Sequence, residues 1–250
     1  MRLLWEFDPQ DIARVRAFYE KHCDNPFVKS RISTNLRTDK PPISKEEFWD
    51  RMVGCLLTTQ QRSGPKSPVT KFLLTKPLPL NYSRCAEQGD LAELACDVLT
   101  DFGGLRRSTT IGKELATNMA FLRKGGWELT LRQVDDLRTN SSPETEKRAA
   151  AFIDDKFKGF GPKQSRNLLQ GLGLSRFEIP IDSRITKWLN AIGFPVTLTA
   201  NALQDRNYYN FVSDGFQKLC EACDIMPCVL DAAIFSSFDK GKWTEENVVW

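Results

Sequence analysis

The chain has 250 residues, enough for one large domain or two small ones with a real core. Hydrophobic residues make up 41% of it and charged residues 27%, which is typical of a soluble globular protein. The net charge of +3 is only mildly basic, so charge alone does not establish a nucleic-acid partner.

The chain contains one histidine, His22, which argues against a histidine-based zinc site or a Ser-His-Asp triad. No apolar run approaches the roughly 20 residues that span a bilayer, and the opening MRLLWEFDPQ becomes acidic too early for a signal peptide. The seven cysteines are an odd number and are scattered, which is typical of reduced thiols. We therefore expect an intracellular monomer without membrane association, in the cytoplasm of a prokaryote or the nucleus of a eukaryote.

The first part of the chain is predicted to be helical in two places. Residues 8–22 open with Asp-Pro and then place apolar residues on one helical face. Residues 44–61 begin with a capping box, in which Ser44 is followed three positions later by Glu47. Residues 24–43 contain no sustained period and are predicted to form a loop.

Helical patterns continue through the rest of the chain. The predicted segments are 108–126, 142–157, 182–193, 207–223 and 228–238. The first of them is expected to end at Gly125-Gly126. No stretch shows a convincing period-2 alternation with hairpin turns, so the predicted fold class is all-α with about ten helices.

The stretch KGFGPKQSRNLLQGLG, residues 158–173, predicts a turn between two helices. One helix ends near Phe157 and the next begins at Pro162. Gly159 and Gly161 let backbone amides point outward, and the second helix adds its free N-terminal amides. This arrangement predicts a phosphate cradle that suits any nucleic-acid sequence. A helical hairpin in which the glycines serve only tight packing is the alternative.

Asp182 follows Lys163 by nineteen residues and is predicted to cap the helix after the hairpin. The combination GFGPKQSRNLLQGLG…IPIDSRITKWL resembles the helix-hairpin-helix DNA glycosylase superfamily, in particular the compact prokaryotic 8-oxoguanine DNA glycosylases. CLLTTQQR, residues 55–62, is similar to the LLSxQ segment of that superfamily, and residues 102–122 are similar to another of its hairpin segments.

The resemblance covers roughly residues 45–195. It implies a base excision repair enzyme that acts on double-stranded DNA containing a damaged base. Members with a lysine at the position of Lys163 cut the glycosidic bond and then nick the strand. By the same resemblance, Gln60 would fill the gap left by a flipped base.

The physical chemistry of Lys163 agrees with this role. A helix N-terminus and a desolvated pocket both disfavour the charged amine, so the neutral amine would attack C1′ and form a Schiff base. Asp182 would stabilise the positive charge that develops on the sugar, or help to move protons. A solvated lysine and an ordinary capping aspartate are the alternatives. The further residues expected to contact DNA are Gly159, Gly161, Gln164 and Arg184, with a solvent-facing arginine as the alternative for the last.

Asp231 and Phe235 are four residues apart and share one face of a predicted helix. They resemble the pair that, in 8-oxoguanine glycosylases, accepts hydrogen bonds from the Watson–Crick edge and stacks on the base. A carboxylate would accept from both N1–H and N2–H of a guanine-type base. The alternative is a core phenylalanine and a surface aspartate. A further hypothesis has Trp250 folding over this pocket.

No cofactor is expected. The endonuclease III branch of the superfamily holds an iron–sulfur cluster on four cysteines near the C-terminus, whereas this region offers only Cys220, Cys223 and Cys228. Hairpins of the superfamily can hold a monovalent cation. The carbonyls expected to do so here are those of Asp155, Phe157 and Phe160.

Together these features predict two helical subdomains with a DNA-binding cleft between them. One is a bundle of residues 48–175 that ends in the helix-hairpin-helix, and the other combines residues 1–47 with 176–250. Lys163 and Asp182 are expected to face each other across the cleft. The leading hypothesis is an 8-oxoguanine DNA glycosylase with AP-lyase activity. The same fold acting on an oxidised pyrimidine, or a non-catalytic DNA-binding module, are the alternatives.

Overall fold

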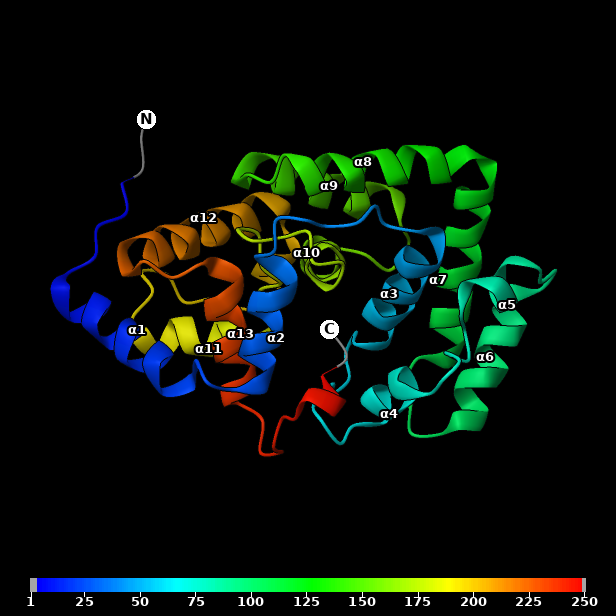
Figure 1. Ribbon diagram of the computed structural model, residues 1–250, viewed down its shortest axis with the longest axis horizontal. Helices are drawn as coiled ribbons and strands as arrows, with labels where there is room; N and C mark the ends of the chain where they lie inside the picture. Colours follow the sequence, from blue (N-terminus) through cyan, green and yellow to red (C-terminus); the bar gives the residue numbers. More distant parts are fainter. Residues whose placement is uncertain (1–3, 249–250) are drawn as a thin grey trace.

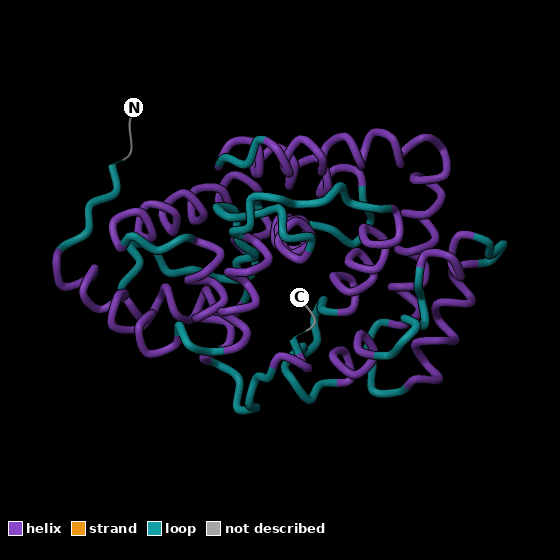
Figure 2. The backbone as a smooth tube through the Cα atoms, in the orientation of Figure 1, coloured by secondary structure: helices purple, strands orange, loops and turns teal. Residues whose placement is uncertain are grey.

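The computed structural model describes residues 4–248, which form helices joined by loops and no strand (Figures 1 and 2). The predicted all-α class is therefore confirmed. Trp250 lies outside the described residues. The α-helices are α1 (Pro9–His22), α2 (Pro26–Asn35), α3 (Lys45–Leu57), α4 (Pro68–Leu74), α5 (Tyr82–Ala86), α6 (Leu91–Phe102), α7 (Ser108–Phe121), α8 (Trp127–Thr139), α9 (Pro143–Lys156), α10 (Pro162–Gly171), α11 (Ser183–Ile192), α12 (Arg206–Cys223) and α13 (Pro227–Ser237).

Helix α2 lies in a region predicted to be a loop, and that prediction is wrong. Pro26 occupies its first turn, and the side chain of Asn25 caps it by accepting from the amide of Phe27 at 2.9 Å. The helix buries Arg31 and Asn35 together with Phe27 and Val28. Because polar residues occupy part of the buried face, the sequence shows no apolar period there.

The predicted stop at Gly125-Gly126 is a sharp bend between two helices. The helical backbone of α7 stops at Lys124 and Gly125, whose φ and ψ angles are not helical, and α8 begins at Trp127. Gly125 has φ of +92°, a backbone conformation that glycine adopts without a steric penalty. The bend places α8 beside α9, the helix that leads into the hairpin (Figure 1).

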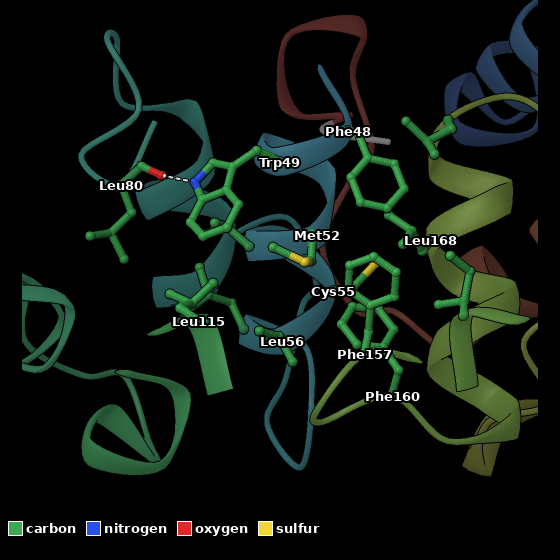
Figure 3. Packing of buried hydrophobic residues seen from close by; sticks show 14 of the residues in the cluster. Phe48, Trp49, Met52, Cys55, Leu56, Leu80, Leu115, Phe157, Phe160 and Leu168 are labelled. Atoms are coloured by element: carbon green, nitrogen blue, oxygen red, sulfur yellow. Dashed lines mark hydrogen bonds between the residues drawn. The ribbon is translucent and has the colours of Figure 1, made fainter. Parts of the chain in front are cut away.

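The apolar residues form one large cluster and two smaller ones. The large cluster lies within residues 48–174, and Figure 3 shows α3 and α10 meeting inside it. The indole nitrogen of Trp49 donates to the carbonyl of Leu80 at 2.9 Å, which satisfies its polar atom within this core. The smaller clusters combine α1 and α2 with residues 179–243. Each cluster thus brings together helices that are neighbours in Figure 1.

Helix α10 lies near the middle of the molecule and is viewed along its axis in Figure 1, with α11, α12 and α13 on one side and α3, α4 and α7 on the other. The C-terminal segment returns to the loop before α4, where a Cβ added to Gly64 would lie 2.9 Å from a carboxylate oxygen of Asp239. Among residues 4–248, no helix is long and apolar enough to cross a membrane.

Candidate active site

A cavity of about 1620 Å³ opens between the two sides of the molecule at the N-terminal end of α10. It is lined by residues from the segment 58–171 and by residues from α2, α11 and α13. The predicted site residues on its walls are Gln60, Gly159, Gly161, Lys163, Gln164, Asp182, Arg184, Asp231 and Phe235. Residues far apart in the sequence are therefore brought to one cavity, which is large enough for a nucleobase and its sugar.

The hairpin turn before α10 is fixed by its neighbours. The side-chain oxygen of Asn118 accepts from the amide of Lys158 at 2.7 Å, and its nitrogen donates to the carbonyl of the same residue at 3.0 Å. Gly159 has φ of +86°, and a Cβ there would lie 2.6 Å from Leu56. Packing therefore requires glycine at this position. Gly161 has open space where a Cβ would stand, so its face of the turn is free to meet a ligand.

The predicted cation site lies at the same turn. The carbonyl of Phe157 accepts from the amide of Phe160 at 3.3 Å, so one lone pair of one predicted ligand is already used. The carbonyls of Asp155 and Phe160 complete the predicted set, and the cation site stays a prediction.

Lys163 is the second residue of α10 and is partly buried in the cavity wall. Its Nζ donates to the side-chain oxygen of Gln164 at 3.3 Å. Burial lowers the pKa of the Lys163 amine, while the negative charge of Asp182 opposes that shift. The site thus favours the neutral, nucleophilic form of the amine more than water does.

Gln164 was expected to contact DNA, but its side chain is buried against α3. Its amide nitrogen donates to the carbonyl of Cys55 at 2.7 Å and to the hydroxyl of Thr59. Its oxygen accepts from Lys163 and from Asn167, the latter at 3.1 Å. The amide of Gln164 therefore uses both its donor and its acceptor groups. It positions Lys163 and supplies a hydrogen-bond donor to a carbonyl in the last turn of α3.

Asp182 caps α11, as the sequence predicts. Its Oδ1 accepts from the amides of Arg184 at 2.7 Å and Ile185 at 3.1 Å. The extended segment before it is held by Tyr209, whose hydroxyl donates to the carbonyl of Ile179 at 2.8 Å and accepts from the amide of Ile181 at 2.6 Å. The second carboxylate oxygen, Oδ2, makes no capping bond and lies at the cavity wall, 3.7 Å from Nη1 of Arg184.

Asp231 is buried in α13 and lines the cavity, so the surface alternative for this residue is wrong. Its Oδ2 accepts from Nε2 of Gln170 at 3.0 Å. Burial raises the pKa of the Asp231 carboxyl to about 7, against the opposing charge of Arg31. A carboxyl that changes charge near neutral pH therefore faces the space where a base would enter.

Phe235 has partners on both faces. The Phe27 ring stacks on it with centroids 5.0 Å apart and planes 19° apart. The guanidinium carbon of Arg184 lies 3.8 Å from the centroid of the same ring. Two groups this close would overlap on one face, so they occupy opposite faces. Arg184 also donates to Asp239 at 3.1 Å and is only 18% exposed, so the solvent-facing alternative is wrong, and its contact with DNA stays a prediction.

Gln60 lies in the loop after α3 and is exposed at the cavity edge. Its φ of +58° is unusual for a residue other than glycine. The neighbouring Gln61 accepts from the amide of Arg106 at 2.9 Å, which ties this loop to the segment before α7. The loop therefore holds an exposed polar side chain in a constrained conformation.

The three C-terminal cysteines are free thiols in apolar surroundings. Cys220 belongs to the cluster around α12 and Cys228 to the cluster around α2. Burial raises the pKa of the Cys220 thiol well above its usual value. Within residues 4–248, no group of three or more His, Cys, Asp or Glu side chains could hold a metal ion. The three cysteines thus have a packing role, and the absence of a cofactor stays a prediction.

The residues of the cavity wall that sequence reasoning missed include Phe27, Arg31, Gln170 and Asp239. Gln170 follows Lys163 by seven residues, which is two helical turns, so helical spacing alone could have placed it on the same face. The residues of α2 carried no such signal, because α2 was not expected.

Three solved structures share this architecture. The 8-oxoguanine glycosylase/lyase of Methanocaldococcus jannaschii in complex with a 15mer DNA containing 8-oxoguanine has a TM-score of 0.66 and 16% identity, over 92% of this chain and 100% of that one. A second structure of the Methanocaldococcus jannaschii 8-oxoguanine DNA glycosylase has a TM-score of 0.62 and 16% identity, over 93% and 95% of the two chains. The 8-oxoguanine DNA glycosylase of Thermotoga maritima has a TM-score of 0.64 and 14% identity, over 94% and 99%.

The chain has the fold of these 8-oxoguanine DNA glycosylases. No protein-family model matches the sequence, and no curated protein is significantly similar to it. At 14–16% identity, the likeness establishes the architecture and leaves the chemistry to be argued from the cavity.

Proposed function

We propose that the protein is a base excision repair DNA glycosylase with AP-lyase activity, which removes 8-oxoguanine from double-stranded DNA. The observation that carries the proposal is the amine of Lys163, desolvated at the start of α10, in one cavity with the carboxylate of Asp182. The fold shared with archaeal and bacterial 8-oxoguanine glycosylases supports the same assignment.

In the proposed reaction, the neutral amine of Lys163 attacks C1′ of the damaged nucleotide. The bond from C1′ to the base breaks, and the base leaves with the bonding electrons and takes up a proton. Positive charge develops on the sugar as that bond lengthens, and the Asp182 carboxylate stabilises it. The capping bonds hold this carboxylate in place, so little reorganisation is needed during the reaction.

The lyase step follows from the covalent intermediate. The lone pair of the Lys163 nitrogen then opens the sugar ring, and O4′ takes up a proton. The product is a protonated Schiff base between Nζ of Lys163 and C1′. Removal of a proton from C2′ then expels the 3′ phosphate by β-elimination. These steps draw on the amine and the carboxylate alone, and they require neither a metal nor an iron–sulfur cluster.

The proposed base pocket lies between α2 and α13. The base would leave the duplex to enter the cavity, with Gln60 at the edge where the strand is left open. Asp231, in its ionised form, would accept from N1–H and N2–H of a guanine-type base. The same carboxylate would repel the acceptor edge of an oxidised thymine.

A strand-cleavage assay on a lesion panel tests the proposal. The substrates are duplexes with 8-oxoguanine, with an oxidised pyrimidine such as thymine glycol, and without damage. We expect cleavage at 8-oxoguanine without added base or heat. Cleavage at thymine glycol alone would favour the pyrimidine alternative, and binding without any cleavage would favour a non-catalytic DNA-binding module.

A further inference from the structure

Arg31 is a buried cation on the wall of the proposed base pocket. It lies on α2 with 5% of its surface exposed, and it lines the cavity together with Asp231. Its Nη1 donates to the carbonyl of Gln170 at 3.2 Å and to the side chain of Asn35 at 3.4 Å. These bonds use one of the three guanidinium nitrogens.

The remaining donors of Arg31 are incompletely paired. Its Nε is buried and has no hydrogen-bond partner, and no carboxylate in residues 4–248 lies within 4.0 Å of the guanidinium. The nearest compensating charge is that of Asp231, which acts on Arg31 through space. A buried guanidinium that lacks a direct carboxylate partner is costly. Nη2 makes no hydrogen bond within residues 4–248, so an acceptor atom on a ligand in the cavity would pair with it.

Arg31 and Asp231 together offer the groups that one edge of a guanine-type base pairs with. Gln170 touches both, since its carbonyl accepts from Arg31 and its amide donates to Asp231. On the Watson–Crick edge of guanine, the acceptor O6 lies directly beside the donors N1–H and N2–H. Guanidinium donors pair well with O6. A donor group next to an acceptor carboxylate therefore reproduces the complement of that edge.

We propose that Arg31 is a specificity-determining residue that donates to O6 of the flipped base beside Asp231. The inference rests on the proposed function and adds a second hydrogen-bonding residue to the proposed base pocket. 8-Oxoadenine carries an amino group in place of O6 and has no N1–H. The amino group of 8-oxoadenine would therefore face the guanidinium of Arg31, donor against donor. We expect the enzyme to reject 8-oxoadenine for this reason, although it shares the C8 carbonyl of 8-oxoguanine.

The test compares excision of 8-oxoguanine and of 8-oxoadenine by the full chain and by R31M, with strand cleavage at a preformed abasic site measured in parallel. Methionine keeps most of the volume of arginine and removes its donors. We expect R31M to lower the ratio of 8-oxoguanine to 8-oxoadenine excision about tenfold or more. A purely structural defect would lower both rates and abasic cleavage together. R132M, on the exposed face of α8, is the matched control and should keep the wild-type ratio.

An unchanged ratio in R31M, in a chain that still cleaves abasic DNA, overturns the Arg31 assignment and leaves the proposed function standing. If R31M does not fold, R31K serves instead, because its single ammonium at a different reach should lower the ratio by about threefold or more. An unchanged ratio in R31K contradicts the assignment equally. A wild-type chain that cleaves none of the three duplexes overturns the proposed function, and Arg31 with it.

Discussion

The guanidinium of Arg184 covers one face of the Phe235 ring, and the ring of Phe27 covers the other. In the proposed complex, a flipped base would therefore meet the guanidinium before it meets the phenylalanine. Arg184 is also held by Asp239, on the segment that returns toward the loop before α4. The stack thus joins α2, α11 and α13 at the cavity wall, and its first role is to place Arg184.

Replacement of Phe235 by leucine should loosen this stack. Loss of the aromatic face removes the cation–π contact of Arg184, and we expect KM for 8-oxoguanine duplex to rise about tenfold. Steady-state kinetics measure the effect. The control is F102L, which alters an aromatic contact with Phe72 of the large apolar cluster. This variant should leave KM near the wild-type value. Equal KM values for F235L and F102L would show that the stack has no role in binding.

The Lys163→Gln substitution should abolish strand cleavage and raise stability. The pKa of Lys163 is lowered in the folded protein, so the unfolded chain binds more protons between the two pKa values, and stability rises with pH through that window. Removing the amine takes away this penalty. We expect Tm at pH 7 to rise by about 2 °C or more, with the gain shrinking toward pH 10. Thermal unfolding of K124Q, an exposed lysine, provides the baseline, and a lowered Tm for K163Q at pH 7 would argue against a desolvated amine.

Asp231 should give a pH dependence to base excision. Its folded pKa of about 7 lies above the ordinary value of 3.8, so the folded state binds more protons between these pH values, and stability falls as pH rises from about 4 to about 7. Excision of 8-oxoguanine should rise over the upper part of that range, because the ionised carboxylate accepts from N1–H and N2–H.

The D231N variant isolates this contribution. Asparagine retains an acceptor for Gln170 but does not ionise. In D231N, the fall in stability with rising pH and the rise in excision rate that Asp231 causes should therefore both disappear. Rate profiles and urea unfolding at pH 5 and pH 8 measure the two effects. Identical profiles for wild type and D231N would remove Asp231 from base reading.

The two glycines of the hairpin should respond differently to alanine. A Cβ at Gly159 meets Leu56 and Glu114 in a left-handed backbone conformation, so G159A should lose about 2 kcal/mol of stability or more. A Cβ at Gly161 meets nothing, so G161A should fold with nearly wild-type stability and bind an abasic duplex more weakly. Urea unfolding and binding at fixed salt separate the two. Unchanged binding by G161A would leave the hairpin with a packing role only.

The parts of the site that the sequence predicts are those with a local chemical signature. Lys163 at a helix start, and Asp182 at an N-cap, are recognisable from spacing and capping chemistry. Asp231 and Phe235 share a face because they are four residues apart. Each of these features depends on residues close together in the chain.

The parts that the sequence does not predict depend on contacts across the chain. Arg31 reaches the cavity because α2 packs on α13, and its partner Gln170 lies 139 residues further along. Gln164 turns toward α3 because the last carbonyls of that helix need donors. Neither arrangement leaves a periodic signal, since polar residues occupy buried positions in both cases.

Borohydride trapping tests most directly whether Lys163 is the nucleophile that forms the Schiff base. The wild-type chain and K163Q are each incubated with 8-oxoguanine duplex and borohydride, and any protein–DNA adduct is digested and mapped. We predict a covalent adduct on Lys163 in the wild type and none in K163Q. No adduct from the wild type, or an undiminished adduct from K163Q, would contradict it.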